Sequence, residues 1–273
     1  MKKETSNYDI RTLQLRLLDM LTAFHQVCQD HQLRYYITCG TLLGAVRHQG
    51  FIPWDDDLDV AMPREDYDLL LAHAREWLPE PFGIVNYMDA ADYSKYFAKM
   101  EDESTTVMER TYLPYVGGIY IDLFPLDDAH PKAWRHRWHM MKFKTLYHRM
   151  VYYCYRDPYK HGRGPNSWIP LLVQRLFQRA TLKRAVEHCV REMNGRGYAQ
   201  YTSHDDGLRR FPKDWFGTPV PIRFEGKTVM GPAKVNDILT RLYGEDYMTP
   251  PPPEKRFQHM FHYCNFDKGY KET

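Results

Sequence analysis

The stretch "FIPWDDDLDV", residues 51–60, constrains the chain most, because it places four aspartates within five positions directly behind a tryptophan. Carboxylates this close together repel one another and raise each other's pKa unless a positive charge lies between them. Solvated acidic runs are usually interleaved with lysine, and this run contains none. Two interpretations follow: an acidic loop exposed to water, or a site for a divalent cation.

Length and composition limit the class of protein. The 273 residues, 43% hydrophobic and 15% aromatic, are enough for a real core in one large domain or two small ones. No segment approaches the roughly 20 apolar residues of a membrane span, and the N-terminus lacks the apolar stretch of a signal peptide. Five scattered cysteines without a CxxC pair argue against a disulfide framework or a zinc ribbon. We therefore expect a cytoplasmic protein.

Periodicity in the first part of the chain predicts alternating helices and strands. Apolar residues at helical spacing predict an amphipathic helix over 10–30. A strand over 33–40 and a short helix over 41–50 follow, and "DLDVAM" predicts a strand whose side chains alternate between two faces. Pro63 suits the first turn of the next helix, which we expect to end near Trp77.

The later segments are less regular. We expect two strands around an acidic turn in residues 96–109, and a strand in "GGIYIDLFPLDD", residues 117–128. Residues 132–194 are mostly helical in pattern, broken by a Gly- and Pro-rich loop over 157–170, and a hairpin around Glu225-Gly226 precedes a helix over 233–243. The fold class is therefore α/β (α+β), a mixed-sheet core with a basic helical elaboration. We expect one compact unit made of a catalytic core (1–130), a basic insertion (131–200) and a C-terminal hairpin and helix segment (201–273).

The alternation Asp55, Asp57, Asp59 raises the question of a calcium loop. Such a loop needs glycine at its sixth position and glutamate at its twelfth, where this chain has Val60 and Asp66, so we reject it. In a strand, Asp57 and Asp59 face the same side about 6.5–7 Å apart along the backbone. Two such carboxylates can share Mg²⁺, with Mn²⁺ as a possible substitute.

A third carboxylate is expected from elsewhere in the chain. Asp122, between Ile121 and Leu123 in an apolar strand, is the best candidate. Asp127 and Asp128 are alternatives, although they follow Pro125 and have the pattern of turn residues.

The segment "GTLLGAVR" supplies the complementary feature. A Gly-Thr turn that leads into a helix presents N–H groups and a hydroxyl to an anion, so Gly40 and Thr41 are candidates for phosphate binding. Arg47, further along the same helix, could bind a phosphate with both guanidinium nitrogens. The order of strand, Gly-Thr helix, D-x-D strand and a later strand with a third aspartate describes a nucleotidyltransferase (polymerase-β-like) core.

At this point the chain resembles the LicD family, whose relatives include bacterial phosphocholine transferases and the fukutin-related proteins. The resemblance lies in three segments: "YYITCGTLLGAVRHQGFIPWDDDLDVAM", "GGIYIDLFPLDD" and "GKTVMGPAKVNDILTRLYGEDYMTPPPPEKR". It implies that Gly40 and Thr41 form the phosphate-side turn and that Asp57, Asp59 and Asp122 are the catalytic metal carboxylates. The role of Asp55 is left open: it could bind metal, orient a basic group or activate the acceptor.

The resemblance also implies a reaction. The family transfers a phospho-alcohol from a CDP-linked donor, such as CDP-choline or CDP-ribitol, to a sugar hydroxyl of a cell-surface glycan or teichoic acid precursor and releases CMP. Lys99 is a candidate phosphate clamp, or else a lysine exposed on an edge strand. Choline would need aromatic side chains around its ammonium group. The candidates for that cage are Trp54, Tyr93, Tyr96, Tyr112, Tyr115 and Trp215.

Histidines offer weaker signals. His136 and His139 have helical i, i+3 spacing, which could hold zinc, but no cysteine or acidic residue lies near them in the sequence. His48, His259 and His262 are candidates to line the site.

Charge is distributed unevenly along the chain. Residues 131–200 contain fifteen Lys/Arg and three Asp/Glu, a net charge of +12, mixed with aromatic residues, whereas the remainder carries −10. Such a surface suits a lipid-linked glycan acceptor or peripheral contact with an anionic membrane at its inner face; we expect no nucleic acid. An ordinary solvated helix face is the alternative.

Three other functions compete with phospho-alcohol transfer: nucleotidyl transfer to a small acceptor, metal-dependent glycosyl transfer, and a non-enzymatic basic scaffold.

Overall fold

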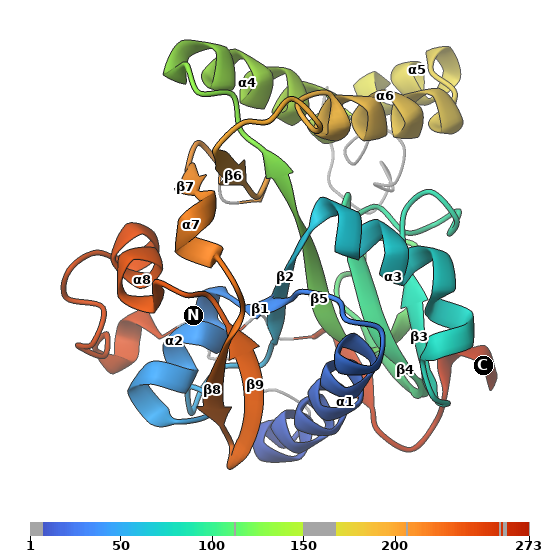
Figure 1. Cartoon of the computed structure of the whole chain (residues 1–273). Helices are drawn as coiled ribbons and strands as arrows, with labels where there is room; N and C mark the ends of the chain where they lie inside the picture. Colours follow the sequence, from blue (N-terminus) through green and yellow to red (C-terminus); the bar gives the residue numbers. More distant parts are fainter. Residues whose placement is uncertain are drawn as a thin grey trace.

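The computed structural model describes residues 8–111, 113–149, 168–205, 207–256, 258 and 261–272. A twisted mixed sheet forms the centre, with helices on its faces and a separate helical layer across one end (Figure 1). The helices are α1 (Ile10–Asp30), α2 (Cys39–His48), α3 (Arg64–Trp77), α4 (Ala133–Arg149), α5 (Trp168–Leu176), α6 (Arg179–Arg191), α7 (Lys213–Phe216) and α8 (Val235–Tyr243). The strands are β1 (Tyr36–Ile37), β2 (Asp59–Pro63), β3 (Phe82–Val85), β4 (Ala98–Met108), β5 (Gly117–Asp128), β6 (Gln200–Thr202), β7 (Phe211–Pro212), β8 (Val220–Phe224), β9 (Lys227–Gly231) and β10 (Tyr263–Asn265).

Sheet order decides where the site lies. The main path runs β1-β2-β5-β4-β10, with β3 also paired to β4 and β6 paired to the end of β5. Strands β2 and β5 run parallel at the centre, and their register places Asp59 beside Asp122. The expected α/β class with a nucleotidyltransferase-type mixed sheet is confirmed.

Helix α1 anchors the first layer, and its bounds are those predicted. The Asp9 carboxylate accepts a hydrogen bond from the Thr12 N–H and caps the helix. Its apolar stripe is buried in the core, and the helix lies against β5 and β9. Helix α3 likewise follows Pro63 and ends at Trp77 as expected, and the hairpin β8–β9 turns at Glu225-Gly226. These three predictions are confirmed.

The expectation of two strands in residues 96–109 is wrong, because the structure has one long strand, β4. The acidic turn is instead a register shift within the β4–β5 pairing, between Asp102 and Val107. Thr105 bridges it: its hydroxyl donates to the Asp102 carbonyl and accepts from the Ile119 N–H. A bulge absorbs the polar residues without ending the strand.

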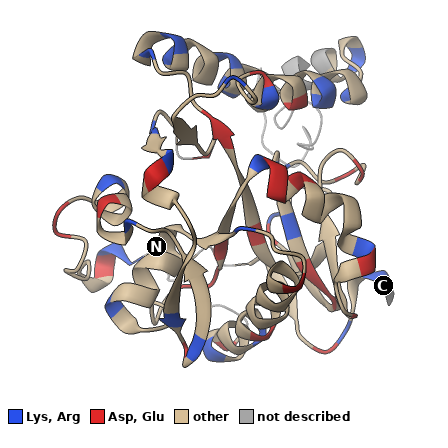
Figure 2. Cartoon of the chain, in the orientation of Figure 1, with Lys and Arg blue, Asp and Glu red and all other residues tan. Residues whose placement is uncertain are grey.

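The basic segment forms the helical layer. Helices α4 and α6 lie side by side, and Figure 2 shows lysines and arginines along them. Their underside closes a second apolar cluster that includes Phe97, Phe124 and Phe143. Their outer side exposes Trp134 (58%) and Trp138 (65%). The loop predicted over 157–170 lies largely outside the described residues. Among the described helices, none combines the length and apolar character that a membrane crossing requires.

Candidate active site

A cavity of about 420 Å³ opens where α2, β2 and β5 meet. Strand β5 supplies three lining side chains at alternate positions, so they share one face of the strand. The cavity is lined by Cys39, Gly40, Asp55, Asp57, Asp59, Lys95, Phe97, Glu109, Tyr120, Asp122, Phe124, Tyr147, Asp205 and Tyr243. Six acids and a single lysine make this lining strongly negative.

The three predicted metal carboxylates converge in this cavity. Asp59 opens β2, and its register partner across the parallel pairing is Asp122 on β5. In register on parallel strands, both side chains face the same side of the sheet. Asp57 lies two residues before Asp59, just outside the strand rather than within it as predicted, and it also lines the cavity.

Burial and repulsion act together on these acids. Burial, and then the charge of Asp57, raise the pKa of Asp59 well above its usual range. Burial also raises the pKa of Asp122 to about 6, although Lys99 opposes the shift. One oxygen of Asp122, Oδ1, is buried and has no hydrogen-bond donor among the described residues. A cation between these groups would remove the repulsion and satisfy that oxygen.

The donor set fits Mg²⁺ or Mn²⁺. Asp57, Asp59 and Asp122 offer only carboxylate oxygens, the ligands that hard divalent ions prefer. Two strands and the loop before β2 hold them in place, so the site does not depend on long flexible side chains.

Asp55 lies at the start of α2, against Gly40. A Cβ atom at Gly40 would lie 2.7 Å from Asp55 Oδ2, so only glycine admits this approach. A carboxylate is favourable at a helix N-terminus, where N–H groups are unsatisfied and the dipole is positive. Neighbouring Asp56 is buried and accepts a hydrogen bond from the Tyr8 hydroxyl, so it holds the loop.

Thr41 lies outside the cavity lining. It is buried on α2, and its hydroxyl accepts a hydrogen bond from the Asp59 N–H at 2.9 Å. This contact fixes the start of β2 against α2. In this structure Thr41 therefore positions Asp59, while Gly40 lies at the cavity wall.

Lys99 is neither exposed nor on an edge strand, so that alternative is wrong. It is 1% exposed on β4, which is paired on both sides. Its ammonium group contacts Glu109, lies 3.7 Å from Asp122 Oδ1 and lies over the Tyr120 ring. Burial would raise the pKa of Glu109, but Lys99 and Lys95 hold it at about 2. Lys99 thus interacts with Glu109 and Asp122 from outside the cavity lining, and Lys95 is the lysine that lines the cavity.

Arg47 does not line the cavity, although it interacts electrostatically with two lining residues, Tyr243 and Asp55. It lies in the last turn of α2, and its guanidinium donates to the Tyr247 carbonyl at 3.0 Å. At a rise of about 1.5 Å per residue, it lies on the order of 10 Å along the helix from Gly40. The role of Arg47 in phosphate binding stays a prediction.

Other sequence candidates lie elsewhere. His48 and His262 are not among the lining residues, and His259 and Tyr112 lie outside the described part of the chain. The remaining cage candidates, Trp54, Tyr93, Tyr96, Tyr115 and Trp215, do not line the cavity either. The aromatic lining is Phe97, Tyr120, Phe124, Tyr147 and Tyr243. Tyr120 and Phe124 flank Asp122 at two-residue spacing, a signal that the sequence contained.

Asp127 and Asp128 are not turn residues but the end of β5. Asp127 is fully buried and accepts two hydrogen bonds from the Arg64 guanidinium, both at 2.7 Å. Lys213 pairs with Asp128. Their charges are already neutralised by protein groups, which excludes them as the third carboxylate of the cavity.

Comparison with known proteins shows what the chain is similar to. Residues 32–157 match a family described as LicD/FKTN/FKRP, nucleotidyltransferase domain. The chain is 28% identical over 271 residues to a Haemophilus influenzae protein named lipopolysaccharide cholinephosphotransferase LicD. The aligned region covers 95% of this chain and 97% of the relative. An uncharacterized protein of Rickettsia prowazekii is 42% identical over 66 residues, 24% of this chain and 23% of that protein.

Proposed function

Residues 32–157 form a LicD-family domain, and from that premise we propose that the chain transfers phosphocholine, or a similar phospho-alcohol, to a sugar hydroxyl of a cell-surface glycan. The Haemophilus relative, similar over nearly the full length, is named for transfer to lipopolysaccharide. We take a CDP-alcohol as the donor, so that CMP is the leaving group.

The observation that carries the proposal is the convergence of Asp57, Asp59 and Asp122 at one cavity beside the α2 N-terminus. Six acids in one cavity would repel a diphosphate donor unless cations accompany it. A purely structural acidic cluster would instead be paired with basic side chains, as Asp127 is with Arg64.

Asp57, Asp59 and Asp122 would hold Mg²⁺ or Mn²⁺. When bound there, such an ion offsets negative charge on the phosphate oxygens and the leaving group. The protein contributes the positions of these carboxylates: the β2–β5 register sets Asp59 beside Asp122, and the Thr41 hydroxyl fixes the Asp59 backbone.

In the proposed reaction, the acceptor oxygen forms a bond to the phosphorus next to the alcohol and the bond from that phosphorus to CMP breaks. The proton of the acceptor hydroxyl passes to a carboxylate of the cavity, for which Asp55 is a candidate. Lys95 is the cationic side chain of the lining and can contact a phosphate oxygen.

Choline recognition falls to the aromatic lining. A quaternary ammonium group donates no hydrogen bonds and is held over ring faces. Tyr120, Tyr147 and Tyr243 reach the cavity from three different elements, and anionic side chains between them add electrostatic attraction. This set replaces the cage expected from the sequence.

We further propose that the glycan acceptor approaches across the basic α4–α6 layer. A lipid-linked acceptor would bring an anionic membrane surface to the exposed Trp134, Trp138 and neighbouring arginines. Tyr147 on α4 lines the cavity, so this layer adjoins the site.

The decisive experiment incubates the protein with Mg²⁺, a panel of CDP-alcohols and a glycan acceptor, and identifies products by mass spectrometry. We expect CMP and a phosphocholine-modified glycan. Release of pyrophosphate from a nucleoside triphosphate would favour nucleotidyl transfer on the same site, and transfer of a sugar would favour a glycosyltransferase. Asp59→Asn serves as the inactive control. If this variant turns over as fast as the wild type, the acidic cavity is not the active site.

A further inference from the structure

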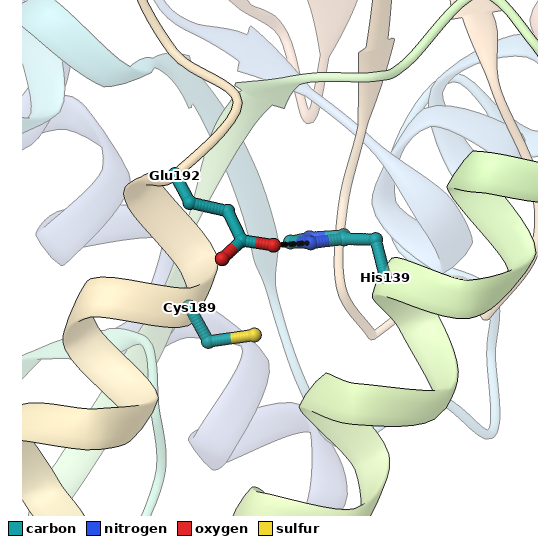
Figure 3. A group of neighbouring side chains, drawn as sticks. All are labelled: His139, Cys189 and Glu192. Atoms are coloured by element: carbon teal, nitrogen blue, oxygen red, sulfur yellow. Dashed lines mark hydrogen bonds and ion pairs between the residues drawn. The ribbon is translucent and has the colours of Figure 1, made fainter.

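A second group of metal-binding side chains lies between α4 and α6. His139 projects from α4 toward Cys189 and Glu192 at the end of α6 (Figure 3). One potential ligand atom from each side chain lies within 4.8 Å of the others. Cys189 and His139 are buried, and Glu192 is partly buried.

The sequence pointed to only one of these residues. Of the i, i+3 pair, His136 is buried without a hydrogen-bond partner for either ring nitrogen among the described residues and is not part of the group. No cysteine or acid lies near His139 in the sequence, but the inference that it has no such partner is wrong. The fold brings Cys189 and Glu192, about fifty positions away in the chain, next to His139.

The contacts around His139 and His204 require one more proton or cation than two neutral imidazole rings supply. Three short contacts run in series: Glu192 Oε1 to His139 Nδ1 (2.8 Å), His139 Nε2 to His204 Nε2 (3.0 Å) and His204 Nδ1 to Asp127 Oδ2 (3.3 Å). Two neutral imidazoles carry one N–H each and can fill only two of these three contacts. The contact left over sets a nitrogen lone pair against a carboxylate oxygen or against the lone pair of the other ring, unless an extra proton or a metal ion lies there; His204 Nδ1 has no hydrogen-bond partner among the described residues.

We propose that His139 Nδ1, Cys189 Sγ and Glu192 Oε1 bind one zinc ion. Nitrogen, thiolate and carboxylate donors suit zinc, whereas Mg²⁺ prefers oxygen alone. Zinc bonds of about 2.0–2.3 Å place tetrahedral ligand atoms about 3.3–3.8 Å apart, so side-chain shifts of about 1 Å complete the site. Metal binding releases the thiol proton of Cys189.

The surrounding groups support this assignment. With zinc on Nδ1, His139 Nε2–H donates to His204 Nε2, which puts the proton of His204 on Nδ1, 3.3 Å from Asp127 Oδ2, so both tautomers are fixed. Lys142 pairs with the other oxygen of Glu192 and leaves Oε1 for the metal.

The group is also accessible. His139 and Glu192 line an open cavity of about 390 Å³, which gives the ion an entry path and room for a water as fourth ligand. The ion would join α4, α6 and, through His204, the segment after β6. Its role is to hold α4 and α6 together within the basic layer.

Cobalt substitution tests the site without an activity assay. Chelator-treated full-length protein is supplied with excess Mg²⁺, which fills oxygen sites, and titrated with Co²⁺. We expect one equivalent of Co²⁺ to produce a thiolate-to-metal charge-transfer band that zinc abolishes. Cys189→Ser should lose the band. Cys39→Ser, which alters the cysteine of the acidic cavity, should keep it.

Two results would overturn the proposal: no band in the wild-type protein, or a band that persists in Cys189→Ser. Should Cys189→Ser fail to fold, Glu192→Gln is the alternative variant. It keeps the size of the side chain at position 192 and the thiol of Cys189, and it is expected to weaken zinc binding at least tenfold. Unchanged zinc affinity in Glu192→Gln would equally overturn the site. Zinc should also raise the thermal midpoint of the wild type and not that of a folded Cys189→Ser variant.

Discussion

Two aspartates on one strand have opposite surroundings. Asp122 and Asp127 lie five residues apart on β5; Asp127 is fully buried, whereas Asp122 is partly buried, with its Oδ1 atom removed from solvent. Asp122 faces other acids, and burial raises its pKa to about 6. Burial acts on Asp127 as well, but the paired Arg64 holds the pKa of Asp127 far below its usual range.

The difference separates a structural carboxylate from a functional one. Asp127 receives its positive partner from the protein and needs nothing else, whereas Asp122 shares Lys99, at 3.7 Å, with Glu109 and depends on whatever enters the cavity. A buried acid without a committed counter-charge is costly to the fold, so its presence indicates a ligand. The following predictions are designed to break or sharpen this contrast.

The largest effect is expected on turnover. Asp57→Asn, Asp59→Asn and Asp122→Asn should each lower the rate at least a thousandfold, about 4 kcal/mol in barrier terms, because an amide cannot replace a carboxylate as a cation ligand. Steady-state CMP release, measured per folded molecule, gives the result. EDTA should silence the wild-type enzyme, and Mg²⁺ or Mn²⁺ should restore it.

Asp128→Asn is the matched control on the same strand, since Lys213 already neutralises that carboxylate. It should retain turnover within about tenfold, or 1.4 kcal/mol. If Asp122→Asn shows the same mild loss as Asp128→Asn, Asp122 is not the third carboxylate.

The second prediction reverses the comparison and concerns stability. Asp127→Ala leaves the largely buried Arg64 guanidinium with Asp68, at 3.7 Å, as its remaining carboxylate partner among the described residues, so the free energy of unfolding should fall by about 3–5 kcal/mol. Denaturant unfolding monitored by circular dichroism measures it. In the same Mg²⁺-free buffer, Asp122→Asn should be as stable as the wild type or more so, because it removes a repelled buried charge. Equal losses in both variants would erase the distinction.

Much of the acidic site could be predicted from the sequence because its parts are contiguous or periodic. Gly40, Asp55, Asp57 and Asp59 fall within twenty residues, between a predicted helix that begins next to Gly40 and a predicted strand that contains Asp59. Asp122 was identified because a lone acid between Ile121 and Leu123 in a strand conflicts with an apolar core. Local rules therefore gave the fold class, α1, α3, the hairpin and the acid set.

What the sequence missed depends on contacts between distant segments. Lys99 has the pattern of an exposed lysine, and only the pairing of β4 with β5 buries it beside Asp122. The Asp127–Arg64 pair joins residues 63 positions apart, and Cys189 reaches His139 only through helix packing. No local motif predicts such contacts between distant segments, so the roles predicted for Arg47 and Lys99 differ from the observed contacts.

The third prediction tests the contrast between the acidic cavity and the basic layer. Arg135, Arg137 and Lys144 are exposed on α4, and each should contribute about 1 kcal/mol of attraction to an anionic leaflet. Reversal of all three to glutamate should abolish sedimentation with anionic liposomes at low salt and impair transfer to a lipid-linked acceptor. Hydrolysis of the soluble CDP-alcohol should be retained.

Lys142 is left unchanged in that variant because it pairs with Glu192. The control reverses Arg75 and Lys227, which lie on other elements; it should sediment as the wild type does. Failure of the wild type to sediment even at low salt would show that the charge is ordinary solvated surface.

The smallest effect is expected at Glu101, where burial outweighs repulsion by other acids. Glu101 is buried on β4 and accepts a hydrogen bond from the Tyr115 hydroxyl. Burial, the largest influence, raises its pKa to about 7 despite that hydrogen bond and Lys99. Between pH 4.5 and 7 the folded protein therefore holds a proton that the unfolded chain has lost, so this residue makes stability fall as pH rises through that window and level off above it.

Glu101→Gln keeps the size of the side chain and removes its charge. The variant should match the wild type near pH 4 and be more stable by on the order of 2 kcal/mol at pH 8. Denaturant unfolding at both pH values measures the difference, and subtraction of the wild-type profile cancels the contributions of Asp59 and Asp122. Glu103→Gln, two residues further along β4 at the surface, should leave the profile unchanged. If Glu101→Gln shows the same pH slope as the wild type, burial alone does not raise the pKa of a carboxyl in this sheet, and repulsion must be the dominant cause at Asp122 as well.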